Sequence, residues 1–369
     1  MIEPNFPTDL PAILNRINNL DVLAYCQNRN YIDGNVSYLS PYISRGVIST
    51  KHVLELIAEK NYEFHEIEIF IKELLWRDYF QRVWQHCNID SDIKSKQMNV
   101  LSIQMPHAIS HACTGIEAID QGIQTLYKTG YMHNHMRMYL SSFACNTLRF
   151  HWNTPAKWMY YHLLDADWAS NACSWQWVSG SFSANKYFAN QDNINKFTHT
   201  EQKGTLLDVD YDAIEHVIPS NELLHSHLLD LKTELPESNQ ISYDPKLPTY
   251  LYNFYNLDPS WHQETSGNRI LLLEPSVFEQ YPVSKSSINF ILELGKNIPH
   301  LQVFVGNFDE FYTKYRPITY FHKEHPLAAY YGGVREQRDW ICAERDEYYP
   351  SFFQYWKKCE EHIQKEYFS

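Results

Sequence analysis

Apolar side chains recur at helical spacing through most of the first half of the chain, and one such stretch runs from Thr129 to Trp152. Residues three and four apart lie on the same face of an α-helix, so the spacing predicts one long helix there. Asn134, Arg137 and Met138 then share a face that carries an amide, a guanidinium and a thioether. A buried helix with one satisfied polar pair gives the same pattern as a helix that faces a ligand.

A second helical stretch runs from Glu66 to His86, and Glu73, Trp76, Arg77 and Phe80 fall on one stripe of it. One interpretation is a core stripe with a surface Glu–Arg pair, which stabilises a helix by only about 0.2–0.5 kcal/mol. The alternative is a binding face, because a wide ring beside a carboxylate and a guanidinium suits a polar aromatic ligand.

The second half of the chain contains short apolar runs separated by a helical pattern. Runs typical of strands cover residues 269–275, 302–308 and 318–322, and helical spacing covers residues 286–297. Strands that alternate with a helix form a parallel sheet, so we expect a small α/β unit that ends in a helical tail over residues 336–367.

Residues 206–268 differ from both halves, because five prolines fall there among Asn, Ser and Tyr. We expect a Pro-rich connector with one short helix near residues 221–231. The expected fold class is therefore mainly α, with an all-helical domain over residues 1–205, the connector, and a small C-terminal α/β unit with its helical tail over residues 269–369.

Aromatic residues make up 15% of the chain and include 10 Trp and 27 Tyr, which is more than packing requires. This excess suits surfaces on which other rings stack, although an aromatic-rich core would also account for it.

The net charge of -13 at first argues against nucleic acid as a partner. Residues 1–205 hold 17 Lys and Arg against 19 Asp and Glu, whereas the remainder holds 14 against 25. The acidity therefore belongs to the second half, and the first half can carry a local basic rim. Any binding to DNA should be weak and should fall quickly with salt.

The seven cysteines are scattered and form no CxxC pair, so we expect reduced thiols in a cytoplasmic protein. No secretion signal precedes the first helical pattern, and no apolar run reaches about 18 residues, so no membrane span is expected. His107, His111 and Cys113 are close enough in sequence to suggest a metal site, but no second ligand cluster answers them, and we expect no metal.

A further motif, LLDADWASNACSWQWVSG, covers residues 163–180 and contains two carboxylates two apart, an Asn, and two Trp two apart. Together with the stretch from Thr129 to Trp152 it resembles the flavin-binding core of the photolyase and cryptochrome family. The resemblance covers roughly Tyr25 to Thr198. It implies an all-helical domain that binds FAD.

In the family, a TSxLSP loop holds the phosphates of FAD, and this chain has VSYLSP, with Val36 in place of the Thr. Ser37 and Ser40 precede a helical segment, so ordinary helix capping is an alternative role for them. The resemblance implies that the phosphates of FAD are contacted by Tyr25, Ser37, Leu39, Ser40 and Arg77. It implies that the flavin ring and the sugar alcohol are contacted by Arg137, Asp165, Asp167 and Asn171.

The same resemblance implies a site for damaged DNA. Its carboxyl and amide groups bond the base, and its two indole rings hold the flipped dimer. Arg29 matches an arginine that clamps a DNA phosphate. The implied catalytic residues are Glu73, Asn134, Met138, Trp76 and Trp177.

Trp175 and Trp152 match the inner two members of a tryptophan chain that carries electrons to oxidised flavin. The outer member has no clear counterpart, and Trp158 or one of the many tyrosines could replace it. Thr147 stands where the family's Asp pairs with the flavin-side arginine, so Arg137 needs another acceptor. Ala189 replaces an arginine.

The family's usual α/β domain ahead of the flavin core is absent, and a smaller α/β unit follows the core instead. The leading hypothesis is a short photolyase that uses light and reduced FAD to split cyclobutane pyrimidine dimers in DNA. Asn171 favours repair, because signalling cryptochromes often carry Asp or Cys at that position. The alternatives are a blue-light sensor that binds FAD and a protein partner, and a helical interaction protein without flavin.

Overall fold

The computed structural model describes residues 4–237 and 240–368, which fall into two compact units that interleave along the chain. Unit 1 contains Asp21–Val36 and His86–Leu231, and unit 2 contains Phe6–Leu20, Ser37–Gln85 and Lys232–Ser369.

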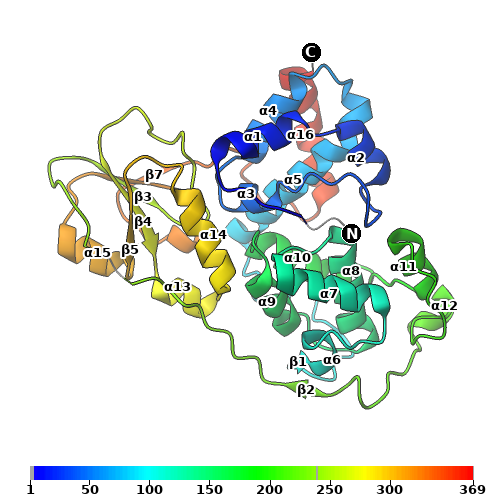
Figure 1. Cartoon of the computed structure of the whole chain (residues 1–369). Helices are drawn as coiled ribbons and strands as arrows, with labels where there is room; N and C mark the ends of the chain where they lie inside the picture. The colour runs from blue at the N-terminus through cyan, green and yellow to red at the C-terminus, as the bar shows by residue number, and fades with distance from the viewer. Residues whose placement is uncertain (1–3, 238–239, 369) are drawn as a thin grey trace. The chain divides into compact units, whose positions relative to one another are not determined.

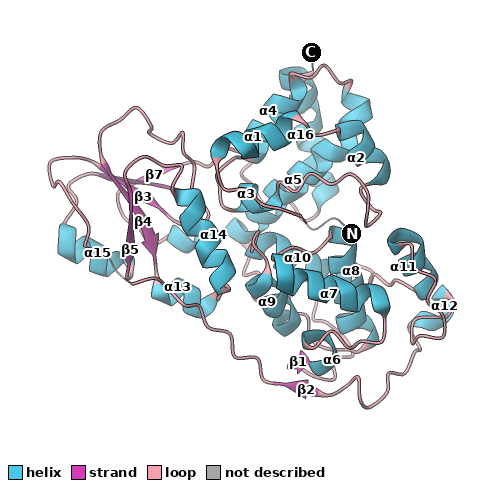
Figure 2. Cartoon of the chain, viewed as in Figure 1, coloured by secondary structure: helices cyan, strands magenta, loops and turns pink. Residues whose placement is uncertain are grey.

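The regular elements of unit 1 are helices joined by loops (Figure 2), apart from one two-stranded antiparallel ribbon in which Met105 faces His227. Its elements are α2 (Val22–Asn28), β1 (Met105–Pro106), α6 (His107–Ser110), α7 (Glu117–Thr129), α8 (Asn134–Ser142), the π-helix η1 (Phe143–Thr147), α9 (Asn153–His162), α10 (Trp168–Ser179), α11 (Gln191–Thr198), α12 (Tyr211–Ile214) and β2 (Ser226–His227).

The single long helix predicted from Thr129 to Trp152 is wrong. Helix α7 ends at Thr129 because Gly130, with φ of 69°, adopts the left-handed conformation that favours glycine at a helix end. Helix α8 starts after His133, continues as the π-helix, and gives way to a turn in which Arg149 has φ of 61°. The sequence pattern missed these breaks because the apolar spacing continues across them.

Unit 2 combines helices with a five-stranded sheet (Figure 1). Its elements are α1 (Leu10–Asn18), α3 (Ser40–Ser44), α4 (Thr50–Ala58), α5 (Phe64–His86), β3 (Thr249–Tyr252), β4 (Asn268–Leu273), α13 (Pro275–Gln280), α14 (Lys285–Gly295), β5 (Leu301–Val305), α15 (Phe308–Tyr315), β6 (Tyr320–Lys323), the 3-10 helix η2 (Pro326–Ala328), β7 (Val334–Glu336) and α16 (Phe352–Tyr367).

The sheet is parallel throughout, with strand order β5-β4-β3-β6-β7. The chain therefore moves outward from β3 through β4 to β5 and then returns to the other side of β3, which is the doubly wound pattern. The predicted parallel α/β unit is confirmed, and β4, β5, β6 and α14 coincide with the runs expected from the sequence to within a few residues.

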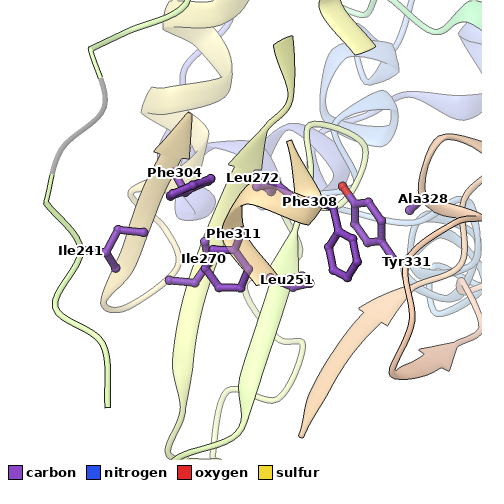
Figure 3. Packing of buried hydrophobic residues seen from close by; sticks show 9 residues of the cluster. All are labelled: Ile241, Leu251, Ile270, Leu272, Phe304, Phe308, Phe311, Ala328 and Tyr331. Carbon is purple, nitrogen blue, oxygen red and sulfur yellow. The ribbon is translucent and has the colours of Figure 1, made fainter. Parts of the chain in front are cut away.

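One face of this sheet packs against α15. Phe308 and Phe311 of that helix form a buried cluster with Leu251, Ile270 and Leu272 of the strands (Figure 3). Neighbouring residues alternate across a strand, so Leu271 and Leu273 point to the opposite face, where each is 0% exposed. Burial on both faces is the reason that β4 reads as a continuous apolar run.

Three local predictions in this half are wrong. Residues 221–231 form turns and strand β2 rather than a helix. The helical tail starts only at Phe352, because β7 ends at Glu336 and residues 337–351 form turns and irregular structure. Strand β3 lies inside the predicted connector. It was not predicted because its four residues, which lie between prolines and polar positions, are too short a run to indicate a strand. The division at residues 205 and 268 stays a prediction, since the two compact units follow other boundaries.

Within the part of the chain that the structure describes, each helix is too short or too polar to cross a membrane.

Candidate functional site

Helix α8 of unit 1 carries three of the predicted site residues. Asn134 is exposed, and its amide Nδ2 lies 3.9 Å from the Met138 sulfur, so these two share a face as predicted. Arg137 turns to Asp165, with 2.9 Å between Nη2 and Oδ2 and 3.4 Å between Nη1 and Oδ1, and its Nε donates to Met132 O at 2.8 Å. This pair identifies the acceptor that Thr147 does not provide.

The loop between α9 and α10 buries two carboxylates. Asp165 is 5% exposed and Asp167 is 4% exposed. Asp167 caps α10, because its Oδ1 accepts from Ser170 N at 2.7 Å, which also places a negative charge at the positive end of the helix. Charged groups persist at such depth only where donors surround them, and here Arg137 and Ser170 N supply such donors, so this loop forms a polar wall rather than plain core.

Asn171 follows within the first turn of α10 and is 7% exposed. Its Nδ2 donates to Ala156 O on α9 at 2.8 Å, which fixes the amide between the two helices. The polar groups of Arg137, Asp165, Asp167 and Asn171 thus come from α8, the α9–α10 loop and α10 of the same unit.

Helix α10 directs its two site tryptophans differently. Trp175 is 2% exposed, whereas Trp177, two residues later, is 38% exposed. Trp177 lies against Tyr187, with 5.9 Å between the ring centroids. One indole is therefore part of the interior, and the other is available at the surface for stacking.

Trp152 is 0% exposed, and its Nε1 donates to Asp92 Oδ1 at 2.7 Å. Trp158, considered as the outer electron carrier, lies instead with Tyr127, to whose hydroxyl its Nε1 donates at 3.1 Å. Tyr127 is 42% exposed, so this second pair reaches the surface.

Helix α2 holds Tyr25 and Arg29 one turn apart, and the Arg29 guanidinium lies 6.0 Å from the centre of the Tyr25 ring. The pair is half-buried within unit 1.

The sequence reasoning passed over His133 and His135, which flank Asn134. Burial lowers the pKa of each imidazole to about 4, with nearby positive groups contributing less. Both are therefore neutral at physiological pH, so the two residues next to Asn134 in the sequence add no positive charge. The HNH spacing was the available signal, but histidines at a helix start are common, and only burial distinguishes these.

In unit 2, the loop expected to hold phosphates leads directly into α3. Tyr38 has φ of 52°, and Leu39 N lies 3.4 Å from Ser37 Oγ. The N-cap residue Leu39 makes no side-chain cap hydrogen bond, and Ser37 Oγ instead accepts from Leu39 N at the start of α3, so the capping role considered for Ser37 remains open. Leu39 is 1% exposed and anchors the loop in the core.

Helix α5 carries Glu73, Trp76 and Arg77, all half-buried. Trp76 contacts Phe80 one turn later, with 5.2 Å between centroids, which confirms the predicted stripe. The ring also stacks on Phe352 at the start of α16, with centroids 3.8 Å apart and planes at 11°. Phe352 therefore covers one face of Trp76.

The possible metal ligands gather only in part. The rings of His107 and His111 stack with 3.8 Å between their centroids, and the centroid of the His227 ring lies 6.1 Å from that of His111. Within residues 4–237 and 240–368, the structure shows no group of three or more His, Cys, Asp or Glu side chains that could hold a metal ion.

A family model described as the FAD binding domain of DNA photolyase matches residues 70–255, about half of the chain. The chain belongs to this family. The domain of DNA photolyase that is matched includes α5 and the whole of the polar wall built by α8, α9 and α10. Tyr25, Arg29, Ser37, Leu39 and Ser40 lie outside the matched range, and the roles of all the predicted site residues, inside the range and outside it, stay predictions.

The relatives include both branches of the photolyase and cryptochrome family. Deoxyribodipyrimidine photo-lyase of Alkalihalophilus pseudofirmus is 26% identical over 234 residues, which cover 60% of this chain and 47% of that protein. The enzyme of the same name from Agrobacterium fabrum is 30% identical over 214 residues, 54% of this chain and 42% of that protein. Cryptochrome-2 of Arabidopsis thaliana is 29% identical over 189 residues, 46% of this chain and 30% of that protein.

The chain thus spans about half or less of the length of these curated relatives. As a member of the family of photolyase FAD-binding domains, it has FAD as its cofactor. The residues present in unit 1 fit that group: buried Asp165 and Asp167 can accept from ring and ribityl donors, and the Arg137 guanidinium and the Asn171 amide supply donors beside them.

Proposed function

We propose that the protein is a light-dependent DNA-repair enzyme that splits cyclobutane pyrimidine dimers. The observation that carries the proposal is the contrast on α10 between buried Trp175 and exposed Trp177. A surface indole beside a flavin-binding wall suits a base that has left the duplex, and an interior indole suits electron transfer. The two relatives named deoxyribodipyrimidine photo-lyase support the same assignment.

Trp177 acts as a stacking platform for one base of the dimer. Stacking on an aromatic side chain is worth about 1–3 kcal/mol per base, which helps to offset a few kcal/mol for unpairing the lesion. Because Tyr187 packs beside Trp177 at 5.9 Å, the ring holds one orientation before DNA arrives. Less rotational freedom is then lost on binding.

Asn134 donates a hydrogen bond to a carbonyl oxygen of the dimer, where negative charge develops during ring opening. Donors aimed at developing charge are most effective where water is excluded. The Met138 thioether lies beside the amide, and Asn134 is exposed in the protein alone, so the bound dimer itself has to exclude water from this donor. Met138 packs against the dimer without competing for its polar atoms.

The family resemblance gives two residues of α5, in unit 2, a role toward the damaged base: a carboxylic hydrogen bond for Glu73 and a stacking ring for Trp76. Phe352 covers one face of Trp76, so at most one face is open to a base. Arg77, one turn from Glu73, pairs with a phosphate of the cofactor, as a guanidinium suits.

FAD, when bound in its reduced form, supplies the absorption of light and the transferable electron. Arg137, held by Asp165, keeps a fixed positive charge at the wall of unit 1. Asn171 can donate and accept hydrogen bonds but neither gives nor takes a proton at neutral pH. The wall therefore orients the cofactor without offering it a proton.

The proposal is tested by photorepair. Protein loaded with FAD and reduced is mixed with an oligonucleotide that carries one thymine dimer, lit with blue light beside a dark control, and the restored thymines are counted. Light-dependent restoration supports the enzyme. Protein that retains reduced FAD and restores no thymine in either sample contradicts it.

The second candidate is a blue-light sensor that binds FAD and a protein partner. The similarity to Cryptochrome-2, at 29% identity, and the acidic second half of the chain favour it. Absence of repair together with a light-dependent change in binding to a partner would support the sensor.

A further inference from the structure

Two fully buried tryptophans of unit 1 lie side by side. Trp152 precedes α9 and Trp168 begins α10, and each is 0% exposed. Their ring centroids are 6.4 Å apart, with planes at 32°. Trp168 therefore lies close to Trp152, as an outer electron carrier must. The sequence alone could not identify such a carrier.

Both indoles donate to carboxylates of one short segment. Trp152 Nε1 donates to Asp92 Oδ1 at 2.7 Å, and Trp168 Nε1 donates to Asp90 Oδ1 at 2.8 Å. Asp92 is held in place because its Oδ2 accepts from Gln97 N at 2.9 Å. Asp90 is half-buried, so it connects the buried ring to the surface.

A carboxylate at hydrogen-bond distance changes the chemistry of an oxidised indole. Its negative charge stabilises a positive ring in a medium of low dielectric constant, and it can accept the N–H proton once the ring has lost an electron. Trp158 offers a contrast within the same unit, because its Nε1 donates to the neutral hydroxyl of Tyr127 at 3.1 Å.

We infer that Trp168 and Asp90 form an outer electron-transfer station next to Trp152, with Trp168 as the electron donor and Asp90 as the acceptor of its indole proton. This inference rests on the proposed function, because the oxidant is photoexcited, oxidised FAD acting through Trp175 and Trp152. The station would serve the reduction of the cofactor, and splitting of the dimer needs only the reduced form.

The step balances in electrons and protons. One electron moves from Trp168 to the radical cation of Trp152, which becomes neutral. The oxidised Trp168 then releases its Nε1 proton to Asp90, which leaves a neutral indole radical and a carboxylic acid. A small thiolate later returns one electron to the indole radical and leaves as a thiyl radical, and Asp90 returns the proton to Nε1.

The test is flash photolysis of the FAD-loaded, oxidised protein without DNA, with the tryptophan radical followed by transient absorption. Trp168→Phe should remove the long-lived radical, and Trp168→Tyr, which restores an oxidisable ring, should recover part of it. Asp90→Asn keeps an acceptor for the indole N–H but takes up no proton, so it should slow deprotonation of the radical cation about a hundredfold.

The matched control is Trp158→Phe, which removes another buried indole and should leave the radical unchanged. An unaltered radical in both Trp168→Phe and Asp90→Asn would overturn the inference, and so would a wild-type protein that binds FAD and forms no tryptophan radical. Far-ultraviolet dichroism and bound-flavin content establish that each variant is folded.

A failure of the proposed repair function is detected by a separate measurement, the repair assay. With chemically reduced FAD, wild type and Trp168→Phe should restore thymines equally, because the electron path is then bypassed. If neither wild type nor Trp168→Phe restores thymines, while formation of the radical still depends on Trp168, the proposed repair function is wrong and the electron-transfer station is supported.

Discussion

Arg137 shows how a single contact arranges the polar wall that is proposed to bind the flavin. The family pairs the corresponding arginine with a carboxylate at the position of Thr147, and here Asp165 takes that part. The pair is nearly bidentate and its carboxylate is buried, so it is worth more than an exposed ion pair. Asp165 therefore pairs with Arg137 and is also part of the polar wall. The pair fixes the orientation of the Asp165 carboxylate relative to α8.

Trp177 is predicted to carry a measurable part of the affinity for damaged DNA. Trp177→Ala should weaken binding of a dimer-containing oligonucleotide by about ten- to a hundredfold, because one stacking contact is lost. Fluorescence anisotropy in the dark measures this, and Trp177→Phe, which keeps an aromatic ring, is the control with a smaller effect. Unchanged affinity in Trp177→Ala would mean that the ring does not meet the base.

Glu73 is predicted to act on the chemical step. Glu73→Ala should lower the number of dimers split per absorbed photon, because it removes a hydrogen bond to the transient anion, while the amount of bound FAD stays the same. Glu73→Gln keeps a donor and should retain more of the yield. An equal quantum yield in wild type and Glu73→Ala would exclude this role.

At the scale of elements, α16 is the partner that fixes α5. Besides the stack of Phe352 on Trp76, Tyr79 Oη of α5 donates to Tyr349 O at 3.1 Å, just before α16. The first residues of α16 thus hold the ring proposed to meet the second base. Its orientation depends on the last segment of the chain.

Removal of the Phe352 ring should destabilise unit 2. Phe352 is 2% exposed, and Phe352→Ala should lower the free energy of unfolding by about 3–5 kcal/mol, the usual cost of a large cavity. Urea unfolding followed by Trp fluorescence measures it, and Phe352→Leu, which fills most of the space, should cost much less. A loss below about 1 kcal/mol in Phe352→Ala would show that α16 does not hold the ring.

Asp78 links α5 to the segment before α16. Burial raises the pKa of its carboxyl to about 6, against the opposing effect of hydrogen bonds from Thr50 Oγ1 at 2.7 Å and Ile341 N at 3.1 Å and of the Arg82 and Arg338 charges. The ordinary value is 3.8, so the folded protein holds this proton more tightly than the unfolded chain does.

The contribution of Asp78 to stability is therefore full below about pH 4 and is lost as the pH rises to about 6, by up to about 3 kcal/mol. The measurement is the free energy of unfolding of wild type and Asp78→Asn at several pH values in this range. The difference between them should shift against the wild type as the pH rises. A difference that is independent of pH would contradict the raised pKa.

On the scale of the whole molecule, charge and connectivity set the conditions for function. The net charge of -13 opposes the approach of DNA, so only local cations can hold the phosphates. The sheet of unit 2 is built from strands late in the sequence, whereas α1, α3, α4 and α5 of the same unit come early. The unit is therefore completed only after the C-terminal segments are made.

Binding of damaged DNA should be strongly dependent on salt. Each phosphate contact contributes a slope of about -0.9 to the plot of log affinity against log salt concentration, and an acidic protein has little other electrostatic attraction. Titrations of a dimer-containing oligonucleotide between roughly 50 and 200 mM salt measure the slope. Affinity independent of salt would mean that stacking alone holds the DNA.

The sequence by itself determined the helical nature of residues 66–86, the parallel sheet late in the chain, and the family with its cofactor. These features depend on periodicity and local motifs, which record burial and backbone spacing over one or two turns. Gly130 and the π-helix lie within the same apolar spacing as the helices, and β3 is only four residues long, so neither break nor strand was visible.

Only the tertiary structure decided which groups far apart in the sequence meet. It gave Arg137 its partner Asp165, covered Trp76 with Phe352, and set Trp168 beside Trp152. Such pairs depend on how elements pack, and packing is determined by the summed shape and burial of many side chains rather than by the spacing along any one segment.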